Sequence, residues 1–276
     1  MTTIYDPHHP LYLDEADTRK ELERVYDLCH GCRLCFKFCP SFPTLFSYVD
    51  MHDDQDAGKM TPAQQDHVVD ECFQCKLCYV MCPYIPELHE WALDFPRLML
   101  RADAMRRANG QVSARDKLTT AVMGHTDALG KVATKAGVVS NVVMGAKPGS
   151  LIRKVVEKTA GISSVRMLPP FAKQRFTTWF KKRPQIRLTK SQGDVAVFPT
   201  CLVEYQDPRI GHDLVKVYEH NGVSCSLAGT TNCCGAPYLH SGDMDTFTKV
   251  AAKNISELVK DVRAGKDIVV PQPTCS

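Results

Sequence analysis

The chain of 276 residues is longer than one ordinary domain, and two or three folded units are expected. Apolar residues make up 44% and charged residues 24%, a composition that excludes a wholly disordered chain. No hydrophobic run approaches the roughly 20 residues that cross a bilayer, and the N-terminus does not resemble a secretory leader. Thirteen cysteines in a chain expected in the cytoplasm therefore indicate metal or redox chemistry rather than structural disulfides.

The net charge of +3 conceals a strong asymmetry along the chain. Residues 1–96 carry a net charge of −10, residues 97–190 carry +16, and residues 191–276 carry −3. These shifts coincide with changes in the hydrophobic pattern, so domain boundaries are predicted near residues 96 and 190. We expect a helical cysteine-rich domain, a basic and mostly helical middle segment, and an α/β domain.

Helix signals dominate the first two segments. Acidic residues at Asp14–Asp17 favour a helix start, as does Thr61-Pro62 between the two cysteine clusters of the first segment. In the middle segment, helices are predicted over 97–109, 113–123 and 151–159, each followed by a glycine within a few residues. Further along, Phe176, Trp179 and Phe180 recur at helical spacing among Lys and Arg residues.

The last segment alternates strand and helix patterns. Strands are predicted over 195–198, 223–227 and 268–270, with one helix from Asp207-Pro208 to His220 and a second helix after Asp243. This βαβαβ order predicts a parallel sheet with helices on its faces.

A twelve-residue cysteine pattern occurs twice in the first segment. The ranges 29–40 and 72–83 both read C-x₂-C-x₂-C-x₃-C-P, which is typical of proteins that bind two [4Fe–4S] clusters. In such repeats the fourth cysteine ligates the other cluster. The predicted ligand sets are therefore Cys29, Cys32, Cys35 and Cys82 for the first cluster, and Cys72, Cys75, Cys78 and Cys39 for the second. Zinc sites or disulfides are the alternatives, although zinc favours separate cysteine pairs.

Four other cysteines follow the predicted strands of the last segment. Cys201 follows the first strand, Cys233 and Cys234 follow the second, and Cys275 follows the third. Because open α/β sheets bind ligands beyond the carboxyl ends of their strands, these four residues are candidate metal ligands for a further iron–sulfur cluster. A redox-active thiol pair or inert cysteines are the alternatives. Cys225 lies within a strand and is expected to be a buried free cysteine.

Both cysteine regions resemble known families. The 32-residue spacer between Cys39 and Cys72 resembles the helical two-cluster ferredoxin domain of succinate dehydrogenase iron–sulfur subunits. Residues Cys201 through Cys275 resemble the CCG domain of heterodisulfide-reductase-type proteins, although Gln272 replaces one cysteine of that family's closing C-x-x-C pattern. With the middle-segment stretch 124–130 and the stretch 168–180, the whole chain resembles the C-subunit family of anaerobic glycerol-3-phosphate dehydrogenase. Members of that family are longer, so a C-terminally incomplete chain is expected.

The resemblance implies an iron–sulfur electron-transfer subunit in anaerobic respiration, peripheral at the cytoplasmic face of the membrane. It implies a flavoprotein dehydrogenase as electron donor, with glycerol 3-phosphate as substrate, and a membrane quinone as acceptor. The absence of a G-x-G-x-x-G fingerprint from the sequence places hydride chemistry on that partner. A heterodisulfide or thiol reductase, a glycolate or lactate oxidase iron–sulfur subunit, and a redox sensor remain as alternatives.

The basic middle segment favours an anionic surface as its partner. Trp179 and Phe180 beside Lys181–Arg183 suit a lipid headgroup region. The alternative is a solvated basic face whose aromatic residues pack inside the protein. Nucleic acid is not an expected partner, because no recognition motif accompanies the charge. His125 is expected to be a structural or capping histidine, and His30 to tune a cluster loop by hydrogen bonding.

Overall fold

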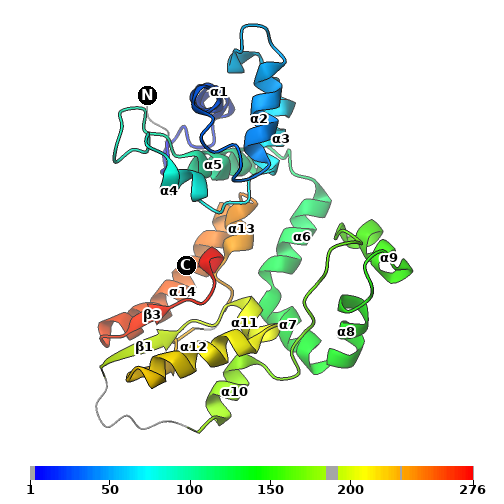
Figure 1. Cartoon of the computed structure of the whole chain (residues 1–276), viewed down its shortest axis with the longest axis vertical. Coiled ribbons are helices and arrows are strands. Elements are labelled where there is room, and N and C mark those ends of the chain that lie inside the picture. The colour runs from blue at the N-terminus through cyan, green and yellow to red at the C-terminus, as the bar shows by residue number, and fades with distance from the viewer. Residues whose placement is uncertain (1–3, 185–191, 231, 276) are drawn as a thin grey trace. The chain divides into compact units, whose positions relative to one another are not determined.

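The computed structural model describes residues 4–184, 192–230 and 232–275. The chain forms two compact units (Figure 1). Unit 1 runs to Asp116 and includes Pro237–Asp245, while unit 2 contains Lys117–Ala236 and the chain from Thr246 onward. The three-domain division at residues 96 and 190 stays a prediction.

Unit 1 is built from helices, as the sequence predicts. Its helices are α1 (Glu15–Cys32), α2 (Ser41–Asp50), η1 (Ala57–Lys59), α3 (Pro62–Asp70), α4 (Leu77–Met81) and α5 (Phe95–Ala108). Asp14 caps α1 by accepting a hydrogen bond from the backbone N–H of Asp17, and Thr61 and Gln64 form a capping box before α3. Both predicted helix starts are therefore confirmed.

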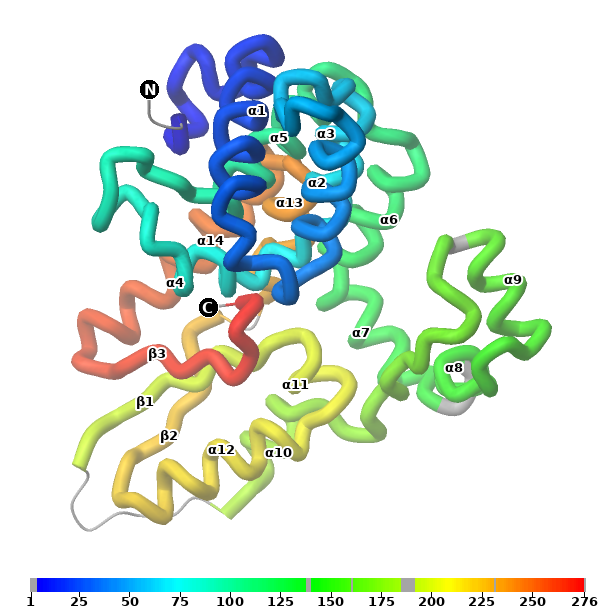
Figure 2. The backbone as a smooth tube through the Cα atoms, turned by 45° about the horizontal axis from the view of Figure 1, so that its top comes forward, coloured from blue at the N-terminus to red at the C-terminus, as the bar shows by residue number. Residues whose placement is uncertain are grey.

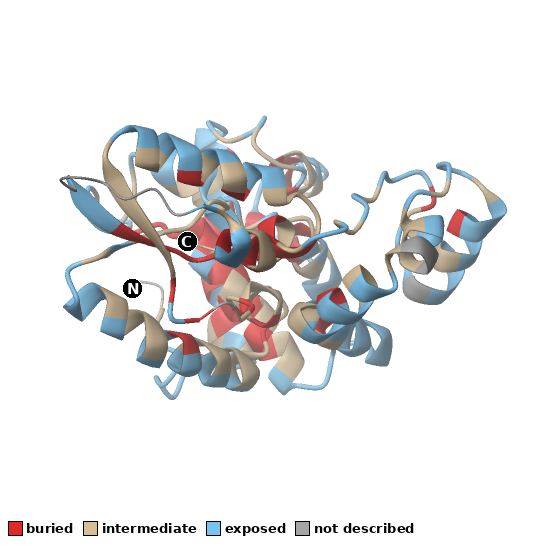
Figure 3. Cartoon of the chain, turned by 90° about the horizontal axis from the view of Figure 1, so that it is seen from below, coloured by how far each residue is buried: buried red, intermediate tan, exposed pale blue. Residues whose placement is uncertain are grey.

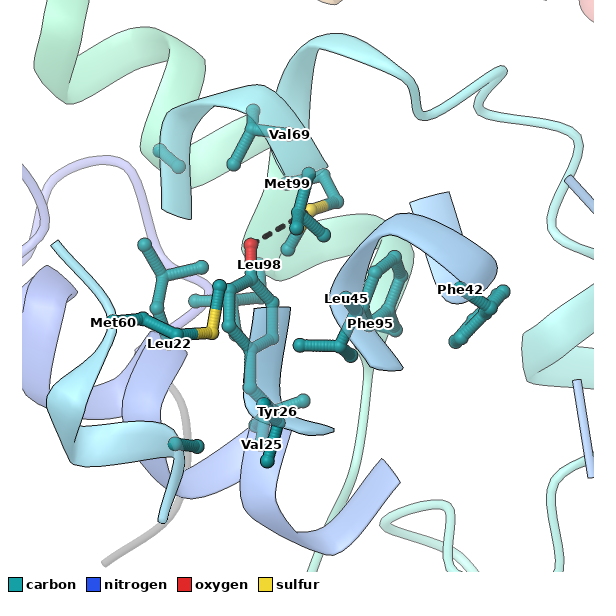
Figure 4. Close-up of a cluster of buried hydrophobic side chains, with 14 of the residues drawn as sticks. Leu22, Val25, Tyr26, Phe42, Leu45, Met60, Val69, Phe95, Leu98 and Met99 are labelled. Atoms are coloured by element: carbon teal, nitrogen blue, oxygen red, sulfur yellow. Dashed lines mark hydrogen bonds between the residues drawn. The ribbon is translucent and has the colours of Figure 1, made fainter. Parts of the chain in front are cut away.

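The core of unit 1 lies between α1, α2, α3 and α5 (Figure 4). Val25 and Tyr26 of α1 pack there with Phe42 of α2 and Leu98 of α5, and all four are almost fully buried. The Tyr26 hydroxyl donates a hydrogen bond to the backbone carbonyl of Gln65, which satisfies the polar end of a buried ring. Six of the eight cysteines of the two repeats pack against this core. The core therefore supports both cysteine loops directly.

Unit 2 contains the predicted parallel sheet (Figure 2). Its strands are β1 (Gly193–Val197), β2 (Val223–Leu227) and β3 (Asp267–Val269), and β1 lies in the centre in the order β2-β1-β3. Helices α11 (Cys201–Tyr205) and α12 (Pro208–His220) connect β1 to β2. Between β2 and β3 the chain forms α13 (Ala236–His240), most of which belongs to unit 1, and then α14 (Met244–Arg263). The predicted fold class, a multidomain chain with a helical domain and an α/β domain, is confirmed.

Helices cover both faces of the sheet. Val197 faces a cluster formed with α10 (Phe176–Lys182), α11 and α12, and its neighbours Ala196 and Phe198 face Leu258 of α14. This alternation follows from the two-residue side-chain period of a strand. The inner half of β1 is buried on both sides (Figure 3), as the central strand of a parallel sheet requires.

Four more helices lie between residues 114 and 160. They are α6 (Ala114–Gly124), α7 (Thr126–Lys135), α8 (Gly137–Met144) and α9 (Leu151–Ala160). His125 lies at the junction of α6 and α7, where its Nδ1 is 2.7 Å from the carbonyl oxygen of Ala121. This histidine is thus structural, as predicted, and it satisfies a carbonyl at the end of α6.

The aromatic residues of α10 do not form a surface for lipid. Phe176 and Phe180 are 0% and 7% exposed and belong to the core of unit 2. Trp179 stacks on the His212 ring with a centroid distance of 3.8 Å, and Arg183 pairs with Glu219 at 2.7 Å. The alternative in which the aromatic residues pack inside the protein is therefore correct, because burial of aromatic rings in a core removes a large apolar area from water.

Gly130 of α7 provides a stability test of the contact between α7 and α11. A Cβ atom at this position would lie 2.6 Å from the ring of Tyr205, whereas one at Gly137 of α8 would meet nothing within 4 Å. We expect Gly130→Ala to lower the free energy of unfolding by about 1–3 kcal/mol through overpacking. Gly137→Ala should be neutral or slightly stabilising, since alanine favours helix. Chemical denaturation of both variants measures this, and equal effects would contradict the close contact.

Candidate iron–sulfur sites

The two cysteine repeats adopt related local structures. In the first, Cys29 and Cys32 occupy the last turn of α1, which ends at Arg33 in a left-handed conformation with φ of 54°. In the second, Lys76 occupies the same position of the repeat with φ of 60°, directly before α4. This conformation costs a non-glycine residue about 1–2 kcal/mol. Its occurrence at matching positions indicates that both loops need their backbone turned in the same way.

A left-handed residue after a right-handed turn orients successive backbone N–H groups toward one side of a loop. Such concave arrangements bind anions and occur around iron–sulfur clusters. The local backbone of both repeats therefore suits an electronegative sulfide-containing group next to the thiols.

Cysteines from both repeats line one pocket. Cys82, the last cysteine of the second repeat, lines it together with three cysteines of the first, namely Cys29, Cys32 and Cys35. The other walls of this pocket are apolar and come from Leu28, Leu34, Phe42, Pro83, Tyr84 and Leu93. The thiols that the sequence assigns to the first cluster are thus brought together across 47 or more positions of sequence.

The second predicted set is also close in space. Cys39 of the first repeat is near enough to Cys72 and Cys78 to influence their ionisation. Burial, with Cys39 and Cys75 nearby, raises the pKa of Cys72 to about 12. Burial, followed by Cys82 and Cys32, raises the pKa of Cys35 to about 12. Several thiols held together at low exposure are thus protonated at neutral pH unless a cation neutralises them.

The four cysteines of unit 2 also meet, at the carboxyl ends of its strands. Cys201 opens α11 after β1, Cys233 and Cys234 lie in the loop after β2, and Cys275 lies in the 3₁₀ turn η2 (Pro273–Cys275) after β3. Hydrogen bonds from Cys233 and then Cys275 lower the pKa of the Cys234 thiol, and a hydrogen bond from Cys233 lowers the pKa of Cys201. All three loops therefore contribute to one group of thiols, as the position of ligands in open α/β sheets predicts.

Asp127 of α7 holds the Cys233–Cys234 loop in place. Its Oδ2 accepts a 2.6 Å hydrogen bond from the backbone N–H of Cys233, and its Oδ1 accepts one of 3.3 Å from the Tyr205 hydroxyl. From the other side, the Asn254 side chain donates a 2.8 Å hydrogen bond to the carbonyl of Cys233. The loop is thereby fixed by residues 106 positions before Cys233 and 21 positions after it.

These supporting residues are not predicted from the sequence as site residues. Asp127 belongs to the stretch 124–130, which the sequence marks only through a family resemblance. Asn254 is buried on helix α14, and a single asparagine among apolar residues gives no sequence signal of this contact. Gly235 follows the two cysteines and has a φ of 94°, a backbone conformation that favours glycine.

Two other predicted positions lie outside these groups. Cys225 is half-buried in β2 and packs against the core of unit 2, which agrees with a free cysteine apart from the metal ligands. His30 is buried, and its Nε2 lies 2.8 Å from Asp50 Oδ1, with Arg33 contacting both groups. His30 thus anchors the end of α1 to the end of α2.

The residues present fit iron–sulfur clusters in three respects. The donor set is thiol only, the first pocket is walled by apolar side chains, and the buried Thr200 hydroxyl next to Cys201 has no hydrogen-bond partner among the described residues. In the described part of the chain, no three His, Cys, Asp or Glu side chains surround a single metal ion's position. A [4Fe–4S] cluster instead takes one thiolate on each iron atom, so its ligands surround a larger body.

Comparison with protein families defines the class. Residues 21–83 match a 4Fe-4S dicluster domain, and residues 195–276 match a cysteine-rich domain, the CCG family. The chain is therefore an iron–sulfur protein that joins a two-cluster ferredoxin-like domain to a CCG domain. No solved structure matches it significantly.

Individual relatives support the particular family expected. The chain is 28% identical over 176 residues to the C subunit of anaerobic glycerol-3-phosphate dehydrogenase from Escherichia coli K12, an alignment that covers 63% of this chain and 43% of that protein. It is also 31% identical over 81 residues to lactate utilization protein A of Bacillus pumilus, covering 29% of this chain and 32% of that protein. The chain is thus homologous to the glycerol-3-phosphate dehydrogenase subunit, of which it matches less than half the length.

Asp127 allows a test of how the CCG loop is held. Asp127→Ala leaves the Cys233 N–H without its acceptor, so we expect a loss of about 1–3 kcal/mol in the free energy of unfolding and fewer bound iron atoms per chain. Asp213→Ala, which removes an exposed carboxylate of α12 that pairs with Lys216, is the control. Equal stability and iron content in the two variants would show that Asp127 does not support the loop.

Proposed function

We propose that this chain is an iron–sulfur electron-transfer subunit of a membrane-associated dehydrogenase complex. It would receive electrons from a flavoprotein and deliver them to a membrane quinone. Bound [4Fe–4S] clusters supply one-electron carriers, which the side chains of the protein lack. The protein itself contributes the thiol ligands, an apolar enclosure that limits water, and surfaces for its partners.

The ligand assignment rests on one observation. Cys82 of the second repeat lines the same pocket as Cys29, Cys32 and Cys35 of the first. This supports a first cluster held by those four residues and a second held by Cys72, Cys75, Cys78 and Cys39. By analogy, we propose Cys201, Cys233, Cys234 and Cys275 as ligands of a further iron–sulfur cluster.

Exposed apolar side chains beside the clusters favour a protein partner. Phe36 of the first loop and Phe73 of the second are 50% and 65% exposed, and Cys32 and Cys75 are themselves exposed. A chain that exchanges electrons needs its clusters close to the surface that a partner covers. These loops are therefore the proposed docking site of the flavoprotein.

Contact with the membrane surface would come from the basic helices rather than from α10. None of the described helices combines the length and the apolar character that a membrane crossing requires. Leu151, Ile152 and Val155 of α9 are exposed next to Arg and Lys residues, which suits a helix lying on a lipid surface. These features support a membrane contact in the middle segment, where the charge asymmetry predicts an anionic partner surface.

The names of the relatives provide the candidate substrates. One relative is a subunit of anaerobic glycerol-3-phosphate dehydrogenase, which favours glycerol 3-phosphate as the substrate of the flavoprotein. Similarity to lactate utilization protein A favours lactate as the second candidate. Purification of the chain with its flavoprotein, followed by quinone reduction with each substrate, distinguishes them. A chain that purifies alone and accelerates neither reaction would contradict the electron-transfer role.

Thiol or heterodisulfide reduction at the CCG site is the second candidate function. It is favoured by the hydrogen bonds that lower the pKa of Cys234, since a thiolate is the reactive form of cysteine. A site that binds substrate sulfur should give a new paramagnetic signal when thiol is added to oxidised protein. An unchanged spectrum would leave electron relay as the function of this site.

The crossed ligand assignment predicts opposite effects for two matched variants. Anaerobically purified protein should contain about eight iron atoms in its N-terminal sites, and Cys39→Ser and Cys82→Ser should each remove about four. Electron paramagnetic resonance should show loss of the second cluster in Cys39→Ser and of the first in Cys82→Ser. The reverse result would show that the fourth cysteine of each repeat binds the cluster of its own repeat. Zinc in place of iron would contradict the presence of iron–sulfur clusters.

A further inference from the structure

A basic pocket lies in unit 2, apart from the cysteine sites. It has a volume of about 770 Å³ and is lined by residues of α7, of the segment before α10, and of α10 itself. The lining residues are Lys131, Thr134, Lys135, Lys173, Gln174, Arg175, Thr178 and Lys182. Every one of these side chains is polar, and five of the eight are cationic.

Helical spacing explains how the two helices present these residues. On α7, Lys131 and Lys135 are four residues apart and share one face with Thr134. On α10, Thr178 and Lys182 are also four residues apart, while the core residue Phe180 lies between them in sequence and on the opposite face. Packing of α10 on the core therefore turns its basic face toward the pocket.

Among the described residues, the charge of this pocket is compensated only at Arg175. Arg175 pairs with the buried Glu204 at 3.5 Å, and Glu204 also accepts hydrogen bonds from Thr177. Within the described residues, the four lining lysines form no ion pair, and no carboxylate lines the pocket. Four like charges around one hollow repel each other, and a bound anion would relieve that repulsion.

We propose that this pocket is a binding site for a ligand that carries two phosphate groups. A phosphate monoester carries a charge of about −1.5 to −2 near neutral pH and a phosphodiester about −1, so two phosphate groups bring roughly two to four negative charges to the four unpaired lysines. A quinone does not suit a lining without apolar side chains, since small-molecule sites for such ligands are mainly hydrophobic. The phosphate groups could belong to a soluble molecule or to a diphosphate lipid headgroup, and the experiment separates these two sources.

Binding to the complete cluster-loaded chain is measured in two parallel assays. Inorganic pyrophosphate is the soluble probe, titrated by calorimetry at low ionic strength. Phosphatidylcholine vesicles with and without cardiolipin are the lipid probe, measured by co-sedimentation. Pyrophosphate binding would identify a soluble ligand, and binding only to cardiolipin vesicles would identify a headgroup. Either result supports the proposed site if substitution of the pocket lysines reduces that binding.

The double variant Lys131→Gln/Lys135→Gln tests the pocket. We expect about tenfold weaker binding from two lost charge contacts, with a steep dependence on salt. Lys249→Gln/Lys253→Gln on α14 removes the same charge at the same spacing from exposed positions outside the pocket and should weaken binding much less. Iron content and thermal unfolding of each variant verify that the fold is kept.

Three results would overturn the proposal. The first is an absence of binding to both probes. The second is an equal loss of binding in the pocket and control double variants, which would show a general charge effect. The third is binding of an acidic partner protein that the pocket variants abolish while neither phosphate probe binds.

Discussion

Burial of thiols from two distant loops against one apolar core is the constraint on which unit 1 depends. The core that contains Val25, Phe42 and Leu98 holds α1, α2 and α5 together, and cysteines of both repeats pack against it. Burial, and then the neighbouring cysteines, raise the pKa of Cys35 and Cys72, so these groups are unfavourable as bare thiolates. The packing energy of the helices keeps them together, and bound iron would supply the neutralising charge.

The same principle appears in unit 2 with a different scaffold. A parallel sheet directs the ends of β1, β2 and β3 to one edge, so Cys201, Cys234 and Cys275 meet without being close in sequence. The sheet alone does not fix the loop after β2, which lies outside the strand ladder. Asp127 of α7 and Asn254 of α14 fix this loop by hydrogen bonds to the backbone N–H and the carbonyl of Cys233. Through Asp127, the helical middle segment has a structural role at the CCG site.

In the middle segment, aromatic and basic residues are mixed in the sequence, but the fold places them on different faces of α10. Phe176 and Phe180 are buried against the sheet helices, whereas Lys182 of the same helix lines the basic pocket. The aromatic residues are therefore part of the core, and the cations remain available to an anion. One face of this short helix is basic and the other is aromatic and packs on the core. The segment therefore resembles a lipid-binding sequence although its rings are not exposed to solvent as a lipid-binding surface would require.

The sequence alone determined the two cysteine repeats, the βαβαβ order and the charge asymmetry, because spacing, alternation and composition are local properties of a chain. Helix ends were also predictable where a cap is encoded in a few residues, as at Asp14 and Thr61. Only the tertiary structure decided that Asp127 holds Cys233 and that Trp179 stacks on His212. Each of these contacts joins residues at least 33 positions apart, and such pairs depend on how whole helices pack rather than on any neighbouring residue.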